Sequence, residues 1–215
     1  MIIVLKGWTM TNPKWLEWAQ SLQALAQAGL TYTENPYDVE RYHAIRDIAA
    51  EMVANNTDID LQVMRELYES QAGYITPKLD VRGVVFRDDE ILLVKELVDG
   101  GWTLPGGWVD VNEPPSAAVE REVWEESGYR VRARKILAVY DRNQHGHPAY
   151  IFHVYKLFIL CELLGGEPTT SLETGGAVFY PKDRLPPLSI ARTTVEEIDR
   201  FFEHHIHPDW PSDFD

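Results

Sequence analysis

Residues Gly107 to Tyr129 read GWVDVNEPPSAAVEREVWEESGY, and this stretch carries the strongest structural signal in the chain. Apolar side chains recur at helical spacing over residues 115–127. Two prolines open that run, where proline suits the first turn of a helix, and Gly128 follows it, where glycine often ends one. The stretch therefore predicts a helix over residues 115–127 that stops at Gly128.

Three glutamates share one face of this predicted helix. Glu122, Glu125 and Glu126 are three and four residues apart, a spacing that brings helical side chains together. Like charges so placed repel each other, and a hard divalent cation would remove the conflict because Mg²⁺ prefers carboxylate and water oxygens. Arg121, one turn before Glu125, can pair with that carboxylate and fix its direction. The spacing alone also fits a solvated acidic helix face.

The residues before the helix form a glycine-rich turn. Leu104, Pro105, Gly106 and Gly107 stand next to each other, and glycine allows the backbone to approach a neighbouring group closely. A backbone carbonyl of this turn, that of Gly107, can therefore lie close to a metal ion bound by the glutamates.

The whole stretch resembles the box of the Nudix hydrolase family, G-x5-E-x7-R-E-U-x-E-E-x-G-U, in which U is a large apolar residue. Every fixed position agrees, and the last U position holds Tyr129, an amphipathic residue and a mild departure. The resemblance implies an α/β fold, the Nudix α/β/α sandwich with a mixed sheet, and hydrolysis of phosphoric anhydrides with Mg²⁺, for which Mn²⁺ can substitute. The matching residues are Gly107, Glu113, Arg121, Glu122, Val123, Glu125, Glu126 and Gly128.

The resemblance also implies roles for these residues. Glu122 and Glu126 are the expected metal ligands, followed by Glu125 and the Gly107 carbonyl. Arg121 would orient a glutamate rather than touch substrate, and Glu113 would support the loop through an outer-shell contact.

The general base is left open between two carboxylates. Glu126 is one candidate, and Glu173, in the sequence Ser171-Leu172-Glu173-Thr174, is the other. Similar proteins tend to carry a second acidic residue just after that glutamate, where this chain has Gly175-Gly176. The glycines weaken the case for a base on this loop and favour a more mobile loop.

Arg82 is a candidate for binding substrate. It lies in an apolar run, residues 79–86, that predicts a strand, and its side chain is expected to face either solvent or the diphosphate. Strand arginines are often surface ion-pair partners, but in a protein of this type a contact with phosphate is a reasonable expectation.

Residues 12–73 show helical stripes and no strand signals. Gly29 is expected to stop the first helix, and Asp58 to cap the third. The run WLEWAQSLQALAQAGLTYTENPYDVERYHAIRDIAAE resembles a helical domain that precedes the Nudix domain in bacterial hydrolases of nucleoside diphosphates linked to a second moiety, such as CDP-choline and ADP-ribose pyrophosphatases. Residues 1–75 are therefore expected to form a small all-helical domain with substrate and dimer contacts, and residues 76–215 the Nudix domain.

From Leu79 the apolar period changes to two, which indicates strands. Strands are expected over residues 79–86, 91–94, 136–140, 151–163 and 177–180, and a last helix over residues 193–204. The polar segment 141–148, with His145 and His147, is expected to form an exposed loop. His204, near the acidic end of the chain, is likewise expected to face solvent.

Composition and charge narrow the possible partners. The formal net charge of −14 argues against binding to nucleic acid or to an anionic membrane, and bound cations would reconcile it with a phosphorylated substrate. No apolar stretch is long enough for a transmembrane helix, and no signal peptide is recognisable. The single cysteine, Cys161, excludes an internal disulfide and suits a cytoplasmic protein.

Together these features and the resemblance predict a Mg²⁺-dependent hydrolase that cleaves a nucleoside diphosphate linked to X, with ADP-ribose and CDP-choline-like compounds as leading substrates. The resemblance also implies a homodimer, which composition does not show. A hydrolase of dNTPs or dinucleoside polyphosphates and a non-catalytic ligand-sensing module are the alternatives. An isomerase would need a catalytic cysteine, and Cys161 lies in an apolar strand where a core position is expected.

Overall fold

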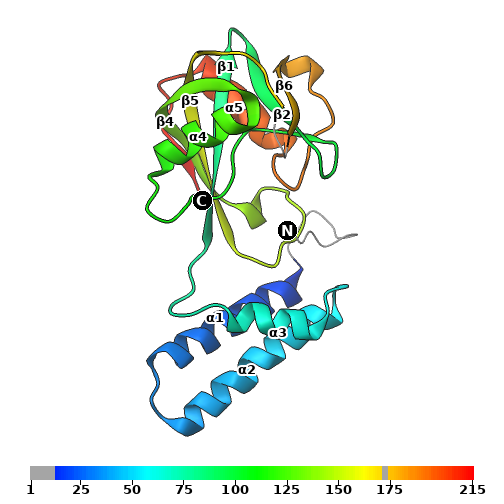
Figure 1. Cartoon of the computed structure of the whole chain (residues 1–215), viewed down its shortest axis with the longest axis vertical. Helices are drawn as coiled ribbons and strands as arrows, with labels where there is room; N and C mark the ends of the chain where they lie inside the picture. The colour runs from blue at the N-terminus through cyan, green and yellow to red at the C-terminus, as the bar shows by residue number, and fades with distance from the viewer. Residues whose placement is uncertain (1–12, 171–173) are drawn as a thin grey trace. The chain divides into compact units, whose positions relative to one another are not determined.

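The structure, a computed structural model, describes residues 13–170 and 174–215 (Figure 1). The chain separates into two compact units. The first comprises Met1–Pro77 together with Pro148–His153, and the second comprises Lys78–His147 together with Val154–Asp215. Each unit has its own arrangement of helices or strands.

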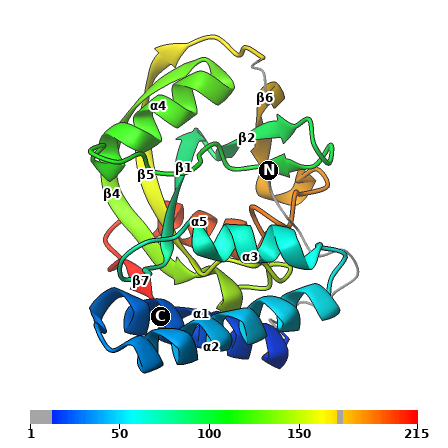
Figure 2. The ribbon, with the colours of Figure 1, turned by 60° about the horizontal axis from the view of Figure 1, so that its bottom comes forward.

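Three helices build the first unit: α1 (Lys14–Tyr32), α2 (Pro36–Asn55) and α3 (Leu61–Glu69). Figure 2 shows α1 and α2 lying alongside each other. The prediction that Gly29 ends α1 is wrong, because the helix continues to Tyr32. A side chain at Gly29 would overlap the ring of Tyr42, whose Cζ atom would lie 2.3 Å from an added Cβ. This glycine therefore lets two helices approach closely instead of ending one.

The third helix starts later than predicted. Its N-cap is Asp60, whose side chain accepts hydrogen bonds from the backbone N–H groups of Gln62 and Val63, and not Asp58. Residues 148–153 also join this unit, since the side chain of Gln20 donates hydrogen bonds to the backbone oxygens of Tyr150 and Ile151 at 3.1 and 3.2 Å.

The second unit contains a seven-stranded mixed sheet with the order β3-β2-β1-β5-β4-β7, in which β6 also pairs with β2. Strand β1 is parallel to β5, and β4 is parallel to β7, whereas the other pairs are antiparallel. The strands are β1 (Lys78–Arg87), β2 (Glu90–Glu96), β3 (Trp102–Thr103), β4 (Tyr129–Asp141), β5 (Val154–Gly166), β6 (Thr174–Pro181) and β7 (Asp213–Phe214). Strand β5 begins at Val154 and not at the predicted Ile151, because residues 148–153 belong to the first unit.

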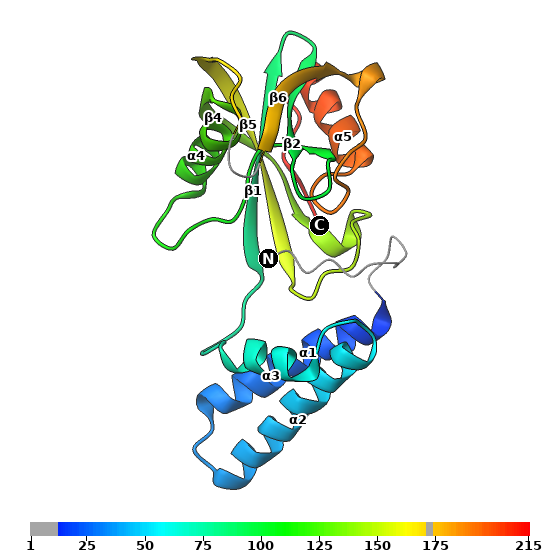
Figure 3. The ribbon, with the colours of Figure 1, turned by 45° about the vertical axis from the view of Figure 1, so that its right-hand side comes forward.

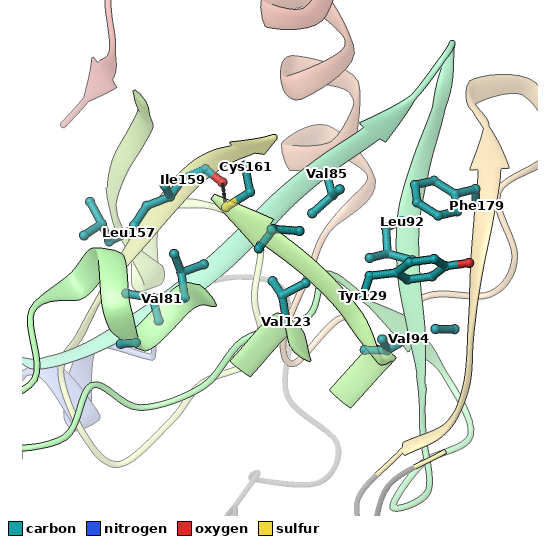
Figure 4. Close-up of a cluster of buried hydrophobic side chains, with 14 residues drawn as sticks. Val81, Val85, Leu92, Val94, Val123, Tyr129, Leu157, Ile159, Cys161 and Phe179 are labelled. Atoms are coloured by element: carbon teal, nitrogen blue, oxygen red, sulfur yellow. Dashed lines mark hydrogen bonds between the residues drawn. The ribbon is translucent and has the colours of Figure 1, made fainter. Parts of the chain in front are cut away.

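Helices α4 (Pro115–Ser127) and α5 (Val195–Ile206) cover opposite faces of this sheet (Figure 3). Side chains alternate between the faces of a strand, and β1 shows this directly. Val81 and Val85 pack in the cluster beneath α4 (Figure 4), whereas Val84 packs with the residues of α5. The α/β/α layers agree with the predicted fold class.

The predicted bounds of α4 are confirmed. Pro115 occupies the first turn, and the helix ends at Ser127. Gly128 follows in the left-handed conformation, with φ of 79°, and its N–H donates to the oxygen of Trp124 at 2.9 Å. Glycine adopts this conformation without steric cost, so it ends the helix at this point.

Candidate active site

The glycine turn before α4 is held against strand β1. The backbone N–H groups of Val81 and Gly83 donate to the oxygens of Gly107 and Pro105, each at 2.8 Å. Gly106 lies between these two contacts with φ of 146°. A Cβ at Gly106 would lie 2.0 Å from the oxygen of Val81, so only glycine fits here without movement of the backbone.

This turn also meets the carboxylates of α4. The N–H of Gly106 donates to Oε2 of Glu126 at 2.9 Å. A Cβ at Gly107 would lie 3.0 Å from Oε1 of Glu122, which shows how closely the backbone passes that carboxylate. The turn and the helix therefore bring two of the predicted metal ligands to one place.

Glu126 is the most deeply buried carboxylate of α4, with 8% of its surface exposed. Burial raises its pKa to about 8, although the positive charge of Arg82 and the hydrogen bond from Gly106 act in the opposite direction. Burial also raises the pKa of Glu122 above its ordinary value. A buried carboxyl group that resists ionisation, with a second, partly buried one on the same helix face, is an electrostatic reason for binding a cation.

Arg121 connects the glutamates of the box. Its Nε and Nη2 atoms donate to the two oxygens of Glu113, each at 2.8 Å. Its Nη1 atom donates to Glu122 at 2.8 Å and to Glu125 at 3.1 Å. These hydrogen bonds lower the pKa of Glu113 and raise that of Arg121. Contacts of this kind are what an orienting residue requires.

Glu125 has a more exposed side chain than the other two glutamates, at 48% against 15% for Glu122. Its carboxylate turns towards Arg121. Within residues 13–170 and 174–215, no three His, Cys, Asp or Glu side chains converge closely enough to form a ready-made metal site. The three carboxylates thus share a helix face but not a single point.

The donor set nevertheless suits a hard divalent cation. Glu126 offers a buried carboxylate, Glu122 offers a partly buried one, and the turn offers backbone carbonyls beside them. The Gly107 oxygen already accepts the N–H of Val81, which leaves it one further lone pair. Gly106, which the sequence interpretation did not single out, has its N–H directed at Glu126, so its peptide also borders the carboxylates.

Arg82 is buried, with 5% of its surface exposed, so the expectation that it could face solvent is wrong. Its Nε and Nη2 atoms donate to the two oxygens of Asp80 at 2.8 and 2.7 Å, and its Nη1 atom donates to the oxygen of Leu104 at 3.2 Å. The sequence interpretation missed Asp80, although its position two residues before Arg82 on one strand places both side chains on the same face. Contact of Arg82 with substrate stays a prediction.

The alternative base, Glu173, lies outside the described residues. Strand β6 begins at the next residue, Thr174, and includes both Gly175 and Gly176.

Two histidines that were expected to be exposed are buried. His147 is 2% exposed and lies 2.9 Å from Glu197 and 2.8 Å from the oxygen of Ile190. His204 is 3% exposed and lies 2.9 Å from Asp213. Glu197 lies 50 residues after His147 and Asp213 lies 9 residues after His204, so the residues directly beside each histidine could not reveal these partners. Cys161 is buried in the core beneath α4, as predicted (Figure 4).

Fold and site together define an enzyme class. An α/β/α sandwich in which an acidic helix meets a glycine turn offers carboxylate and backbone carbonyl oxygens, and such oxygens suit a divalent cation. A hydrolase of phosphoric anhydrides has this architecture, and the comparison with known proteins leads to the same class.

Residues 76–202 match the NUDIX domain, and residues 13–68 match a domain described as UDP-X-like, N-terminal oligomerisation domain. The chain belongs to the NUDIX family of hydrolases, whose members generally use divalent metal ions. The protein YjhB of Bacillus subtilis (strain 168), provisionally named an ADP-ribose pyrophosphatase, is 45% identical over 202 residues, covering 94% of this chain and 97% of YjhB.

Two solved structures agree with this assignment. A crystal structure of a UDP-X diphosphatase has a TM-score of 0.61 at 30% identity, with 94% of this chain and 98% of that chain covered. An ADP-ribose pyrophosphatase from Streptococcus suis has a TM-score of 0.60 at 42% identity, with 65% and 100% covered. Among the residues described for the present chain, no helix combines the length and apolar character needed to cross a membrane.

Proposed function

We propose that this protein is a Mg²⁺-dependent pyrophosphohydrolase that cleaves a nucleoside diphosphate linked to X into a nucleoside monophosphate and X-phosphate. In the reaction, the oxygen of a water molecule forms a bond to one phosphorus atom while the bridging P–O bond breaks. A base accepts one proton of the water, the remaining hydroxyl becomes part of the new phosphate group, and the leaving phosphate takes the electron pair of the broken bond.

The observation that carries this proposal is the position of Glu126. Its carboxyl group is buried, its pKa is raised to about 8, and it is fixed by the N–H of Gly106 beside Glu122. Burial disfavours the charged form of a glutamate that has only a structural role. A bound divalent cation restores the charged form, so this position suits a metal ligand.

Each residue then has a role. Glu122 and Glu126 hold Mg²⁺, or Mn²⁺ in its place, with Glu125 and the backbone carbonyl of Gly107 completing the set. The bound ions would neutralise the phosphate oxygens and lower the pKa of water at the site. Arg121 orients Glu122 and Glu125, and Glu113 keeps Arg121 in place through its two hydrogen bonds.

The proton of the attacking water needs an acceptor, and Glu126 and Glu173 are the two candidates for that base. Arg82 is proposed to act on the diphosphate, and its pairing with Asp80 fixes the direction of its guanidinium group. Gly128 contributes by ending α4 directly after Glu126 and Ser127.

Three groups of substrates follow from the sequence and the relatives. ADP-ribose and CDP-choline-like compounds come from the resemblance of the helical run, and the name of YjhB supports the first. The structural similarity to a UDP-X diphosphatase adds UDP-linked compounds. All three share a diphosphate between a nucleoside and a second group. The box residues are proposed to act on this diphosphate.

The family match of the helical region and the cysteine content support two further proposals. The match of residues 13–68 to an N-terminal oligomerisation domain supports a homodimer in which residues 1–75 form the dimer contacts and residues 76–215 the catalytic domain. The single cysteine supports a cytoplasmic location.

A substrate panel tests the activity. Purified protein with Mg²⁺ is given ADP-ribose, CDP-choline, a UDP-sugar, a dinucleoside polyphosphate and dNTPs, and released nucleoside monophosphate is quantified. Turnover of one nucleoside-diphosphate-X compound is expected. A preference for dNTPs would refute the proposed substrate class and favour a dNTP hydrolase.

Variants test the site. Glu122→Gln and Glu126→Gln remove one charge each and are expected to lower kcat by a factor of about 10² or more, since metal ligands carry a large share of such catalysis. Glu196→Gln, at an exposed position of α5, is the matched control and should behave as wild type. Full activity in the first two variants would refute the metal site.

A further inference from the structure

The last turn of α4 has an unusual set of hydrogen-bond partners. The final carbonyl groups of a helix lack the N–H partner that lies four residues ahead in the helix interior. Gly128 satisfies the oxygen of Trp124 locally. The oxygens of Glu126 and Ser127, by contrast, are satisfied by residues more than forty positions away in sequence.

Both partners come from the segment that follows β5. The hydroxyl group of Thr174 donates to the backbone oxygen of Glu126 at 2.7 Å. The backbone N–H of Thr169 donates to the oxygen of Ser127 at 3.0 Å. Thr169 and Thr174 therefore hold the end of the acidic helix at two points.

Close packing supports these two contacts. A Cβ at Gly128 would lie 2.4 Å from the oxygen of Glu167, and a Cβ at Gly166 would lie 2.4 Å from the oxygen of Gly128. Glycines on both sides thus allow two backbones to meet. The end of α4 has no room to shift unless the segment shifts with it.

Thr174 is well placed to hold the helix. It is 1% exposed, and as the first residue of β6 it lies opposite Glu96 of β2 in the sheet. Because the sheet fixes its backbone, its hydroxyl group has a defined position. Glu126 is then held at two ends, by Gly106 at the carboxylate and by Thr174 at the backbone oxygen.

We infer that Thr174 is a positioning residue for the metal site, because its hydroxyl group fixes the helical turn that carries Glu126. The inference rests on the proposed function insofar as Glu126 is taken as a metal ligand. Loss of the hydroxyl leaves the buried oxygen of Glu126 without this donor, and the turn relaxes to find another partner. A carboxylate displaced by a fraction of an ångström binds the ion less well and catalyses more slowly.

Thr174→Val tests the inference because it removes the hydroxyl group and keeps the shape of the side chain. Thr174→Ser keeps the hydroxyl group and should therefore retain wild-type metal affinity. Thr170→Val makes the same change at an exposed threonine of the same segment and serves as the control. Should the valine variant fail to fold, Thr174→Ala and Thr174→Ser form a second pair that differs only in the hydroxyl group.

The primary measurement is the affinity for Mn²⁺, from the electron paramagnetic resonance signal of the free ion, without substrate. The Kd for Mn²⁺ is expected to rise about tenfold in Thr174→Val, which is the size of change typical when a group that supports a metal ligand is lost. In Thr174→Ser and Thr170→Val the Kd should stay within about twofold of wild type. In turnover assays kcat is expected to fall by a similar factor while KM changes little.

Other outcomes overturn specific claims. A folded Thr174→Val protein that binds Mn²⁺ as tightly as wild type would refute the positioning role while the proposed function stands. Equal losses in the valine and serine variants would show that keeping the hydroxyl group does not preserve the site, and would also refute it. Wild-type protein that neither binds Mn²⁺ nor hydrolyses any substrate would refute the proposed function itself.

Discussion

Arg121 donates hydrogen bonds to three different glutamates of the candidate active site. It bonds both oxygens of Glu113 and one oxygen each of Glu122 and Glu125. The sequence predicted a pairing with Glu125, which lies one turn further along the helix, but the contact with Glu113 depends on how the loop before α4 folds back. The planar guanidinium group can serve all three carboxylates because its five N–H groups point in fixed directions.

Arg121→Lys should therefore reduce activity strongly, although it keeps the positive charge. Lysine keeps the charge but cannot form the two-pronged contact with Glu113, so the glutamates lose their common anchor. We expect kcat to fall by about tenfold or more and the metal concentration for half-maximal activity to rise. Arg134→Lys, at an exposed ion pair with Glu162, is the control. Wild-type kinetics in Arg121→Lys would show that the anchor is unnecessary.

Cys161 provides a test that does not depend on the active site. It is 2% exposed, and burial raises its pKa to about 12. The folded protein therefore disfavours the thiolate, and the free energy of unfolding should fall as the pH rises from about 9 towards 12. Because the chain has one cysteine, labelling is easy to count.

At pH 8 we expect a thiol reagent such as DTNB to label almost no native protein and one thiol per chain in denaturant. Rapid labelling of the native protein would contradict the buried position and would reopen the isomerase alternative, which needs a reactive cysteine.

Among the elements, α4 shows how far a sequence pattern can go. Its start at Pro115, its end at Ser127 and the left-handed Gly128 all follow from local rules for helix ends. Strands also appear in each region where the period of two predicts them, but β4 begins at Tyr129 and not at the predicted Ile136. Strand β5 begins at Val154 and not at Ile151, and β7 was not predicted. What local rules could not supply are contacts between distant residues, such as His147 with Glu197 or Thr174 with the oxygen of Glu126.

The wrong predictions have the same cause. Gly29 looked like a helix end, but the ring of Tyr42 from the next helix occupies the space beside it. For Arg82 the sequence left two directions open, solvent and the diphosphate, but the side chain is buried and its three nitrogen atoms donate to Asp80 and Leu104. In both cases a partner from tertiary structure outweighed the local preference.

The turn before α4 permits a sharp test at the level of the loop. Gly106→Ala places a Cβ 2.0 Å from the oxygen of Val81 at a φ of 146°, so the backbone has to move. Gly100→Ala is the matched control, because Gly100 also has positive φ, 73°, but nothing lies within 4 Å of an added Cβ. We expect Gly100→Ala to cost about 1 kcal/mol of folding free energy and Gly106→Ala clearly more.

Urea unfolding measures both costs, and kinetics should show that only Gly106→Ala loses activity, because its N–H no longer meets Glu126. Equal destabilisation by the two substitutions would mean that the turn is looser than its contacts indicate.

For the molecule as a whole, the net charge is −14, so bound cations should raise the free energy of unfolding as well as support catalysis. A ligand that binds only the folded state at a hundred times its Kd adds about 2.7 kcal/mol to the free energy of unfolding. For a chain of this size that corresponds to a rise in Tm of about 5–10 °C. We expect Mg²⁺ to produce this rise and a chelator to reverse it.

General screening of an acidic chain also stabilises it, so NaCl at matched ionic strength is the necessary control. Glu126→Gln should lose the specific part of the effect and keep the part that NaCl reproduces. If Mg²⁺ and NaCl shift Tm equally, stabilisation comes from screening and not from the site.

Finally, the first unit is not a continuous piece of chain, because Pro148–His153 belongs to it. The backbone passes between the units three times, after residues 77, 147 and 153. A gene fragment that stops at Pro77 therefore lacks part of its own unit, including the acceptors for Gln20. The two halves of a chain split at that point are natural candidates for reassembly in trans, and transplanting the helical module onto another enzyme would require carrying over a short internal insert as well.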